Sequence, residues 1–414
     1  MHFARWRADA AGGGQIRRAA AWMGYMLLVV WCVWWIANLT QGRMLWAERT
    51  WIRLPAFGVD FVGHVDKPAR TWMDGGDPYA DQQRRFSYPP IVTRLFMWVK
   101  LTDPQTSLRI WICLASLCAA LGAVAVTRFR RTLGLEEIPI SLALAAILFS
   151  TPVLFALERS NYDLLIVPCV VGAVALMRKE DATADAAAGM LLAIAIWAKL
   201  YPGIIILSLL ALRRWRAAVW TIVFAAFIGL ADVPELLRFV GNIRIDIDDA
   251  NRLAAFVHDI HPWNHPLAIV WRDLWAGTPL SYIPGKVGAA LLIGTLVASV
   301  SWYVYNSPVR ERMTLPFLFW SIAAATFIPA ISNDYNLTPL PLAALALWSR
   351  RFGWPIYAGL LLLAVWWQPI ALPLPGRAVH FVKLIGLIAV AAILVRQARA
   401  ITETDKRQSL AVQP

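Results

Sequence analysis

Long apolar runs separated by short polar segments make up most of this chain. A helix needs about 20 apolar residues to cross a bilayer core, and runs close to that length recur between residues 22 and 395. With the run 186–212 counted as two arms, the pattern predicts about twelve transmembrane helices. The predicted spans are 22–39, 107–127, 138–157, 163–177, 186–212, 217–233, 286–305, 314–330, 337–348, 353–367 and 379–395.

Two apolar runs depart from a simple span. Basic clusters flank both ends of 186–212, which indicates that the chain enters the membrane and returns. The break is expected at Lys199-Leu-Tyr-Pro202, because proline disrupts a helix interior; one long helix is the alternative. The run 88–101 is too short to span and contains Arg94 and Lys100, which predicts an interfacial helix.

The basic residues lie in short clusters between the apolar runs. Lys and Arg concentrate in the cytoplasmic loops of membrane proteins, so these clusters predict that both termini are cytoplasmic. The net charge of +13 therefore requires no nucleic-acid partner, since such binding needs charge gathered on one face. The clusters are Arg17-Arg18, Arg128-Phe-Arg-Arg131, Arg178-Lys179, Arg213-Arg-Trp-Arg216, Arg310-Glu-Arg312, Arg350-Arg351 and the tail with Arg396, Arg399, Lys406 and Arg407.

The composition predicts a multi-pass membrane protein, and we expect it in the plasma (inner) membrane. Apolar residues make up 59% of the chain and charged residues 16%, whereas a soluble domain carries about a quarter charged residues. The four cysteines lie inside apolar runs and indicate neither a disulfide framework nor a metal cluster. We expect an all-α helical bundle with a cytoplasmic tail at 1–21, one transmembrane domain at 22–395 and a second cytoplasmic tail at 396–414.

Polar residues gather in four segments on the predicted extracytoplasmic side. Short connections between helices need only turn residues, so carboxylates, amides and cations at the mouths of spans indicate a binding site. The segments are the first loop at 40–106, the stretch Glu158-Arg-Ser-Asn-Tyr-Asp163, the later loop at 234–285 with His258-Asp-Ile-His-Pro-Trp-Asn-His265, and the turn Ser332-Asn-Asp-Tyr-Asn336.

Several short motifs follow one another in a recognisable order. They are Asp60-Phe, Ala69, Gly75-Gly-Asp-Pro-Tyr79, Phe86-x-Tyr-Pro-Pro90, Asn161-Tyr-Asp163, Gly189, Lys199-x-Tyr-Pro202 and the turn at 332–336. In this order and membrane placement the chain resembles glycosyltransferase family 87. These are membrane enzymes of the GT-C superfamily, and they include polyprenol-phosphate-mannose-dependent mannosyltransferases.

The resemblance implies a GT-C type bundle with a juxtamembrane helix in the first extracytoplasmic loop. It implies a polyprenyl-phosphate-linked sugar donor, with mannose the family default, and a hydroxyl acceptor on a glycolipid or glycan. Attack opposite the phosphate would invert the anomeric centre through a transition state of oxocarbenium character, as in glycoside hydrolysis. No cofactor is implied, and we expect a metal-independent reaction.

The resemblance places the catalytic aspartate at Asp60. A carboxylate within hydrogen-bond reach of the acceptor hydroxyl can act as a general base, an effect of about 10²–10⁴-fold. The alternative is a loop acid paired with Arg53 or Arg70. Asp66 and Asp74 are weaker candidates for the base.

Two cations are expected to bind the donor phosphate. Lys199 lies deep in an apolar run, where a charge costs roughly 2.5–3.5 kcal/mol, so an anionic partner is expected; snorkelling to the interface is the alternative. Arg159 stands at the mouth of a span, and its alternative is a surface pair with Glu158. Arg84 and Arg85 rank below these two cations.

Further substrate contacts are expected from Asn161, Tyr79, Asp77, Tyr88, Asn333, Asp334 and His265. Asp77 lies in a sequence that also suits an ordinary turn or helix cap. His258, His261 and His265 have spacings that could place metal ligands on one helical face, but Pro262 and Pro266 interrupt that helix. A sugar-contacting loop is the favoured interpretation.

Two other classes of protein remain open at this point. A multi-pass transporter would fit the broken run near Lys199, although no matching half is seen elsewhere. A polysaccharide polymerase or ligase would use an arginine-rich late loop. The aspartate-rich first loop favours extracytoplasmic catalysis.

Overall fold

A computed structural model describes residues 2–41, 58–80, 86, 88–242, 267, 271, 277–279, 285–329, 334–349 and 376–412. Every regular element in these ranges is helical, and they contain no strand, which confirms the all-α prediction. The predicted span at 353–367 lies outside the described residues.

Five described helices are long and apolar enough to cross a membrane. The candidate spans lie in α1 (His2–Gln41), α5 (Pro104–Thr132), α9 (Ala182–Lys199), α14 (Gly285–Asn306) and α18 (Gly376–Val412). Two bent helix pairs raise this number to as many as seven. The count of about twelve stays a prediction, because the other apolar helices are shorter. They include α8 (Ile166–Met177), α10 (Ile205–Ala211), α15 (Thr314–Ala325) and α16 (Pro339–Leu347).

The two bent pairs replace runs that we expected to be single helices. The run 138–157 forms α6 (Ile140–Leu148) and α7 (Thr151–Arg159), which meet at 61°. The run 217–233 forms α11 (Trp215–Leu230), which is followed at 92° by the helix Val233–Asn242. Pro152 and Pro234 stand in the first turn of the second helix of each pair, where a missing N–H costs nothing.

The break predicted at 199–202 is confirmed. Helix α9 ends at Lys199, Leu200 takes a left-handed φ of 55°, and the short helix η4 (Tyr201–Ile204) leads into α10. Of the three helices α9, η4 and α10, only α9 is long enough to span a membrane by itself. The predicted interfacial run 88–101 forms α4 (Ile91–Leu95) and η2 (Met97–Leu101).

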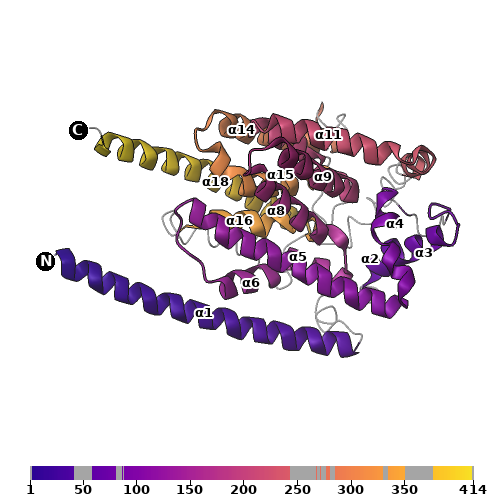
Figure 1. Cartoon of the computed structure of the whole chain (residues 1–414), viewed down its shortest axis with the longest axis horizontal. Coiled ribbons are helices and arrows are strands. Elements are labelled where there is room, and N and C mark those ends of the chain that lie inside the picture. Colours follow the sequence, from indigo (N-terminus) through magenta and orange to yellow (C-terminus); the bar gives the residue numbers. More distant parts are fainter. Residues whose placement is uncertain are drawn as a thin grey trace.

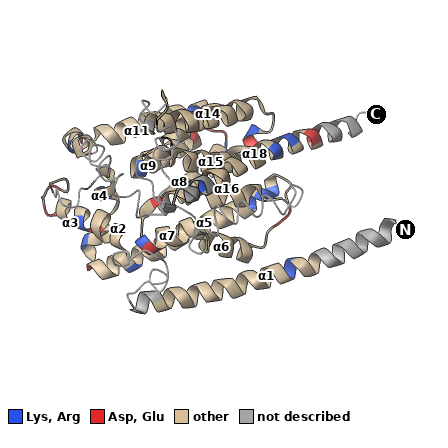
Figure 2. Cartoon of the chain, turned by 180° about the vertical axis from the view of Figure 1, so that it is seen from behind, with Lys and Arg blue, Asp and Glu red and all other residues tan. Residues whose placement is uncertain are grey.

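The helices of the first loop lie at the end of the bundle opposite both termini (Figure 1). They are α2 (Val59–Phe61), η1 (Val62–Asp66), α3 (Lys67–Met73) and α4. Helix α5 begins directly after this group and ends with the basic cluster at Arg130 and Arg131. Uncharged residues cover most of the length of the long helices, including α1 and α14 (Figure 2).

Ion pairs show that basic clusters from distant parts of the chain lie together. Arg214 pairs with Glu180 and Glu311, at 3.9 and 3.6 Å. Arg312 pairs with Asp405 at 3.2 Å. Arg17 and Arg131 share Glu137 in the same way. The ion pairs therefore gather the clusters into two groups, which agrees with a positive-inside pattern.

Arg130 has a second role inside the bundle. Its guanidinium is buried and donates to the carbonyl oxygens of Leu345 and Trp348, at 2.8 and 2.6 Å, at the end of α16. It also donates to the carbonyl of Glu136 at 2.7 Å. A cation at this position satisfies carbonyls that a helix end leaves without partners.

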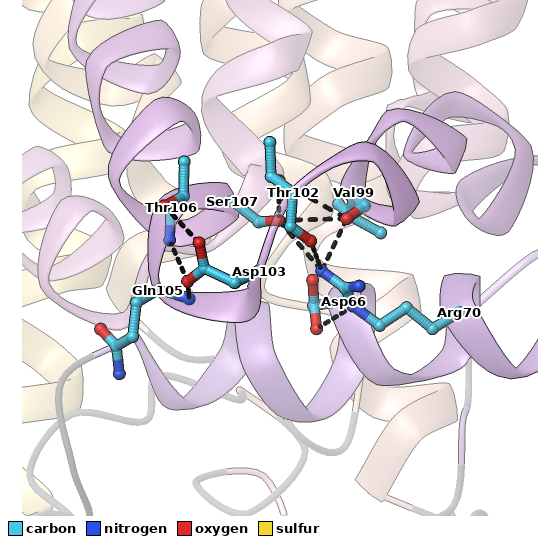
Figure 3. Close-up of polar contacts among 8 residues, drawn as sticks. All are labelled: Asp66, Arg70, Val99, Thr102, Asp103, Gln105, Thr106 and Ser107. Atoms are coloured by element: carbon cyan, nitrogen blue, oxygen red, sulfur yellow. Dashed lines mark hydrogen bonds and ion pairs between the residues drawn. The ribbon is translucent and has the colours of Figure 1, made fainter.

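An arginine joins the first-loop helices to the start of α5 (Figure 3). Arg70 donates to Asp66 at 3.0 Å, and its Nη2 donates to the carbonyl oxygens of Val99 and Thr102, both at 2.6 Å. The same nitrogen lies 3.3 Å from the hydroxyl of Ser107. These bonds fix α3 against η2 and α5, so the first loop has a rigid base.

Asp103 caps the first turn of α5 beside this arginine (Figure 3). Its Oδ1 accepts from the backbone N–H groups of Gln105 and Thr106, at 3.0 and 3.1 Å. Two of the unpaired donors at the helix start are thereby satisfied.

Candidate active site

A glycine turn carries Asp60 into the protein. Gly58 has a left-handed φ of 72°, and its N–H donates to the carbonyl of Glu158 at 3.1 Å. A Cβ at this position would approach Leu108 to 2.6 Å, so a larger residue does not fit without a shift. The turn joins the start of α2 to the end of α7 and leaves Asp60 only 4% exposed.

Asp60 is held by Arg159 and Asn161. Arg159 donates from Nε to Oδ2 at 3.0 Å and from Nη2 to Oδ1 at 2.5 Å, which is a bidentate ion pair. Asn161 donates from Nδ2 to Oδ2 at 2.9 Å. Three donors thus occupy a carboxylate that has about four acceptor positions. The remaining position is on Oδ1.

The turn between Arg159 and Asn161 brings both side chains to one carboxylate. Ser160 ends α7 with a left-handed φ of 54°. Its carbonyl accepts a hydrogen bond from Trp111 Nε1 at 3.0 Å, which anchors the turn to α5. Without that reversal of the chain, the two side chains would leave the helix in different directions.

The surroundings keep Asp60 ionised. Burial alone would raise the pKa of this carboxyl. The hydrogen bond and charge of Arg159, with the hydrogen bond from Asn161, outweigh burial and hold the pKa of Asp60 below its ordinary value. The group is therefore a carboxylate at neutral pH.

A second cluster centres on Lys199 at the end of α9. Its ammonium lies 4.5 Å from the ring centroid of Tyr88 and 4.6 Å from that of Tyr162. It also donates to the hydroxyl of Tyr88 at 3.3 Å and pairs with Asp163 at 3.6 Å. The side chain is 7% exposed, so Lys199 does not snorkel to a surface.

Three of the sequence motifs meet at Asp163. Its Oδ1 accepts from the hydroxyl of Tyr201 at 3.0 Å, and its Oδ2 accepts from Asn336 Nδ2 at 2.7 Å. Asn161 joins this cluster to the first, because its Oδ1 accepts from the backbone N–H of Asp163 at 3.1 Å. Asp60, Asn161, Asp163 and Lys199 therefore form one continuous polar centre.

Tyr79 contacts Tyr88 within the first loop, whereas the contacts of Asp77 are with Tyr79 and Arg238. Tyr79 donates its hydroxyl to the carbonyl of Tyr88 at 2.9 Å. Burial and the nearby carboxylates of Glu235 and Asp77 raise the pKa of Tyr79, so it stays a neutral donor. Asp77 accepts from the N–H of Tyr79 at 2.9 Å, which is the turn role considered above, and pairs with Arg238 at 3.3 Å.

The helix Val233–Asn242 packs against the first-loop helices α3 and α4. Arg94 pairs with Asp232 and, at 3.7 Å, with Glu235. Trp72 donates from Nε1 to Glu235 at 2.6 Å and lies under the Arg94 guanidinium, 5.6 Å away. The first and later extracytoplasmic loops predicted from the sequence are therefore in direct contact.

The structure describes some of the alternative ion pairs that the sequence suggested. Arg70 pairs with Asp66 at 3.0 Å, so the suggested Asp60–Arg70 pair is wrong. Asp74 pairs with Lys100 at an exposed position. Several other candidates lie outside the described residues. They are the suggested partner Arg53, the lower-ranked Arg84 and Arg85, the substrate-contact candidates Asn333 and His265, and the alternative metal ligands His258 and His261. Asp334 begins η7 (Asp334–Leu337), but its side chain also lies outside the described part of the chain.

Sequence reasoning did not single out Asp163, Tyr162, Tyr201 and Asn336 as site residues. The signal was present, because each lies within a motif that the resemblance had quoted: Asn161-Tyr-Asp163, Lys199-x-Tyr-Pro202 and the turn at 332–336. No group of three or more metal-ligating side chains occurs among the residues that the structure describes.

Comparison with known proteins gives one match. Residues 86–258 match the model of Glycosyltransferase family 87. No curated protein and no solved structure matches the chain. The matched segment contains Tyr88, Arg159, Asn161 and Lys199, whereas Asp60 precedes it. The match supports the resemblance seen in the motifs and favours an enzyme over a transporter.

Proposed function

We propose that the chain is an inverting glycosyltransferase that uses a polyprenyl-phosphate sugar; the match of residues 86–258 to the model of Glycosyltransferase family 87 supports this proposal. The sugar, mannose in this proposal, moves to a hydroxyl of a lipid-linked or glycan acceptor. The lipid part of the donor reaches the site from the bilayer, in which the apolar helices are embedded.

The observation that carries the proposal is the position of Asp60. Its carboxylate is buried and ionised, and it lies in one polar centre with two cations, Arg159 and Lys199. A base beside cations suits transfer from a phosphate, because the base accepts a proton while the cations stabilise the leaving anion.

The proposed reaction is a single displacement. The acceptor hydroxyl oxygen bonds to the anomeric carbon, and the bond from that carbon to the phosphate oxygen breaks with its electron pair leaving on the phosphate. The hydroxyl proton goes to Asp60. Because Arg159 and Asn161 occupy the other acceptor positions, Oδ1 is the atom that receives it.

Lys199 and Arg159 are the proposed partners of the donor phosphate. Arg159 pairs with Asp60 and Lys199 pairs with Asp163, and both cations are largely shielded from solvent, so an added anion interacts with them more strongly than it would in water. Tyr88 accepts a hydrogen bond from Lys199, and Tyr79 donates one to the backbone carbonyl of Tyr88. Asn161, Asp77, Asn333, Asp334 and His265 complete the proposed substrate contacts.

The proposed topology places this centre on the extracytoplasmic side of the plasma (inner) membrane. The first-loop helices lie opposite both termini, which supports a site facing away from the cytoplasm (Figure 1). The ion pairs that gather the basic clusters support cytoplasmic termini. About twelve spans in a GT-C type bundle remain part of the proposal.

The test is transfer from radiolabelled polyprenyl-phosphate mannose by membranes that contain the protein. We expect Asp60→Asn to lose about 10²–10⁴-fold in rate, since it keeps the shape and removes the base. Asp74→Asn is the matched control, because Asp74 is an exposed carboxylate of the same loop. Equal loss in both variants would remove Asp60 from the mechanism. No transfer from mannosyl or other lipid-phosphate sugars would contradict the proposed function and favour a transporter.

A further inference from the structure

Asp163 is a fully buried carboxylate that the proposed displacement does not use. It is 0% exposed, and its two oxygens serve different parts of the chain. Oδ1 faces Lys199 and Tyr201, at 3.6 and 3.0 Å, and Oδ2 accepts from Asn336 at 2.7 Å. An ionisable group at such a depth is costly and calls for a role.

We propose that Asp163 is a positioning residue that sets the place of the Lys199 ammonium and aligns η7 (Asp334–Leu337) with it. This inference rests on the proposed function, in which Lys199 binds the donor phosphate. Asp163 acts through Lys199 and does not itself touch the reacting atoms.

The lysine side chain needs such a partner. Its four-carbon stem is flexible and its ammonium is a point charge, so it does not define its own position. The rings of Tyr88 and Tyr162 favour a cation over their faces but leave its direction loose. Asp60 is bound by Arg159 and Asn161, and among the described carboxylates it is Asp163 that forms an ion pair with Lys199.

The same carboxylate also links the base to η7. Asn161 bridges Asp60 and the backbone N–H of Asp163, at 2.9 and 3.1 Å. Asn336, the last residue of the motif 332–336, joins Asp163 from η7. A displacement of Asp163 would therefore move the cation and η7 relative to Asp60.

Asp163→Asn is a nearly isosteric probe of this role. The amide oxygen of the new asparagine can still accept from the Tyr201 hydroxyl. Its amide NH₂ can donate to Asn336 once the Asn336 amide has flipped to present its oxygen. The substitution therefore removes mainly the charge. We expect a loss of about 10²-fold in kcat/KM for the donor, because a cation displaced by about 1 Å binds the developing phosphate charge poorly. The KM for the acceptor should not change.

The deciding experiment is a double-mutant cycle with Asp163→Asn and Lys199→Gln on purified full-length protein. If Asp163 acts through Lys199, the double variant is no slower than Lys199→Gln alone, within about twofold. Multiplied losses would show a general structural role and overturn the inference. Tyr201→Phe is the control for loss of one uncharged bond, with an expected loss of about fivefold or less.

Two further measurements keep the result decisive. The yield and unfolding temperature of each variant report folding, and Asp163→Glu, which keeps the charge, enters the same cycle if Asp163→Asn does not fold. If the wild type transfers no sugar, the proposed function fails and the inference falls with it. If the wild type transfers sugar and the losses multiply, the inference alone fails.

Discussion

Arg159 donates two hydrogen bonds to Asp60, a residue 99 positions earlier in the chain, at 3.0 and 2.5 Å. The two residues come from the end of α7 and from α2. This pair keeps Asp60 ionised, and together with the bond from Asn161 it leaves one acceptor position on the carboxylate, at Oδ1.

Replacement of Arg159 by lysine tests the geometry of this pair. A lysine keeps the charge but cannot form the two parallel bonds. We expect Arg159→Lys to lose about 10–10²-fold in kcat, and Arg159→Gln to lose more, in the radiolabel transfer assay. Arg131→Lys, at an exposed ion pair, is the control. Full activity in Arg159→Lys would show that only the charge matters.

The pH dependence of stability should change sign when Arg159 is removed. In the wild type the lowered pKa of Asp60 means that its ionisation stabilises the fold above about pH 4, the unfolded value, and that this contribution is lost as pH falls through the lower folded pKa. In Arg159→Gln, burial is opposed only by Asn161 and more distant charge, so the pKa of Asp60 should rise and its ionisation should destabilise the fold.

The measurement is the difference in unfolding temperature between each form and its Asp60→Asn counterpart, from pH 4 to pH 8. We expect the wild-type difference to favour Asp60 across this range. In the Arg159→Gln background the difference should favour Asp60→Asn at neutral pH and shrink on acidification. Parallel curves in the two backgrounds would contradict the assigned cause of the shift.

Arg130 should contribute to stability rather than to catalysis. Arg130→Met leaves the carbonyls of Leu345, Trp348 and Glu136 without this donor. Since a buried acceptor left unsatisfied costs about 1–3 kcal/mol, we expect a clearly lower unfolding temperature. The neighbouring Arg131→Met, which removes only an exposed pair, should be close to the wild type. Equal effects would mean that Arg130 acts only as one more basic residue of its cluster.

Gly189 allows α9 and α11 to approach closely. A Cβ at this position would lie 2.8 Å from the backbone nitrogen of Thr221 and 2.6 Å from Cβ of Trp220. Small residues at helix contacts drive packing in membranes. Gly189→Leu should therefore cost at least about 1–3 kcal/mol of stability, measured as unfolding temperature in detergent. Gly294→Leu on α14, where nothing lies within 4 Å, is the matched control and should be tolerated.

The helical character of the chain and the position of its main break follow from local sequence. Apolar runs predict helices because a bilayer leaves the backbone no other partners. The break after Lys199 was predictable because Pro202 limits the helix that precedes it. The bends after α6 and α11 were missed, although prolines mark them, because apolar composition does not distinguish one bent span from one straight span.

The sequence alone determined that this chain is helical with apolar helices suited to a membrane, and it predicted basic clusters on one side and a polar site on the other. Through the motifs of the family resemblance it also predicted Asp60, Arg159, Asn161 and Lys199 as residues of one site. Only the tertiary structure decided which charged side chains form ion pairs: Asp60 with Arg159, Lys199 with Asp163, and Arg70 with Asp66. The physical reason is that helix periodicity is a local property, whereas the partner of a buried charge is chosen by the packing of segments up to 218 residues apart.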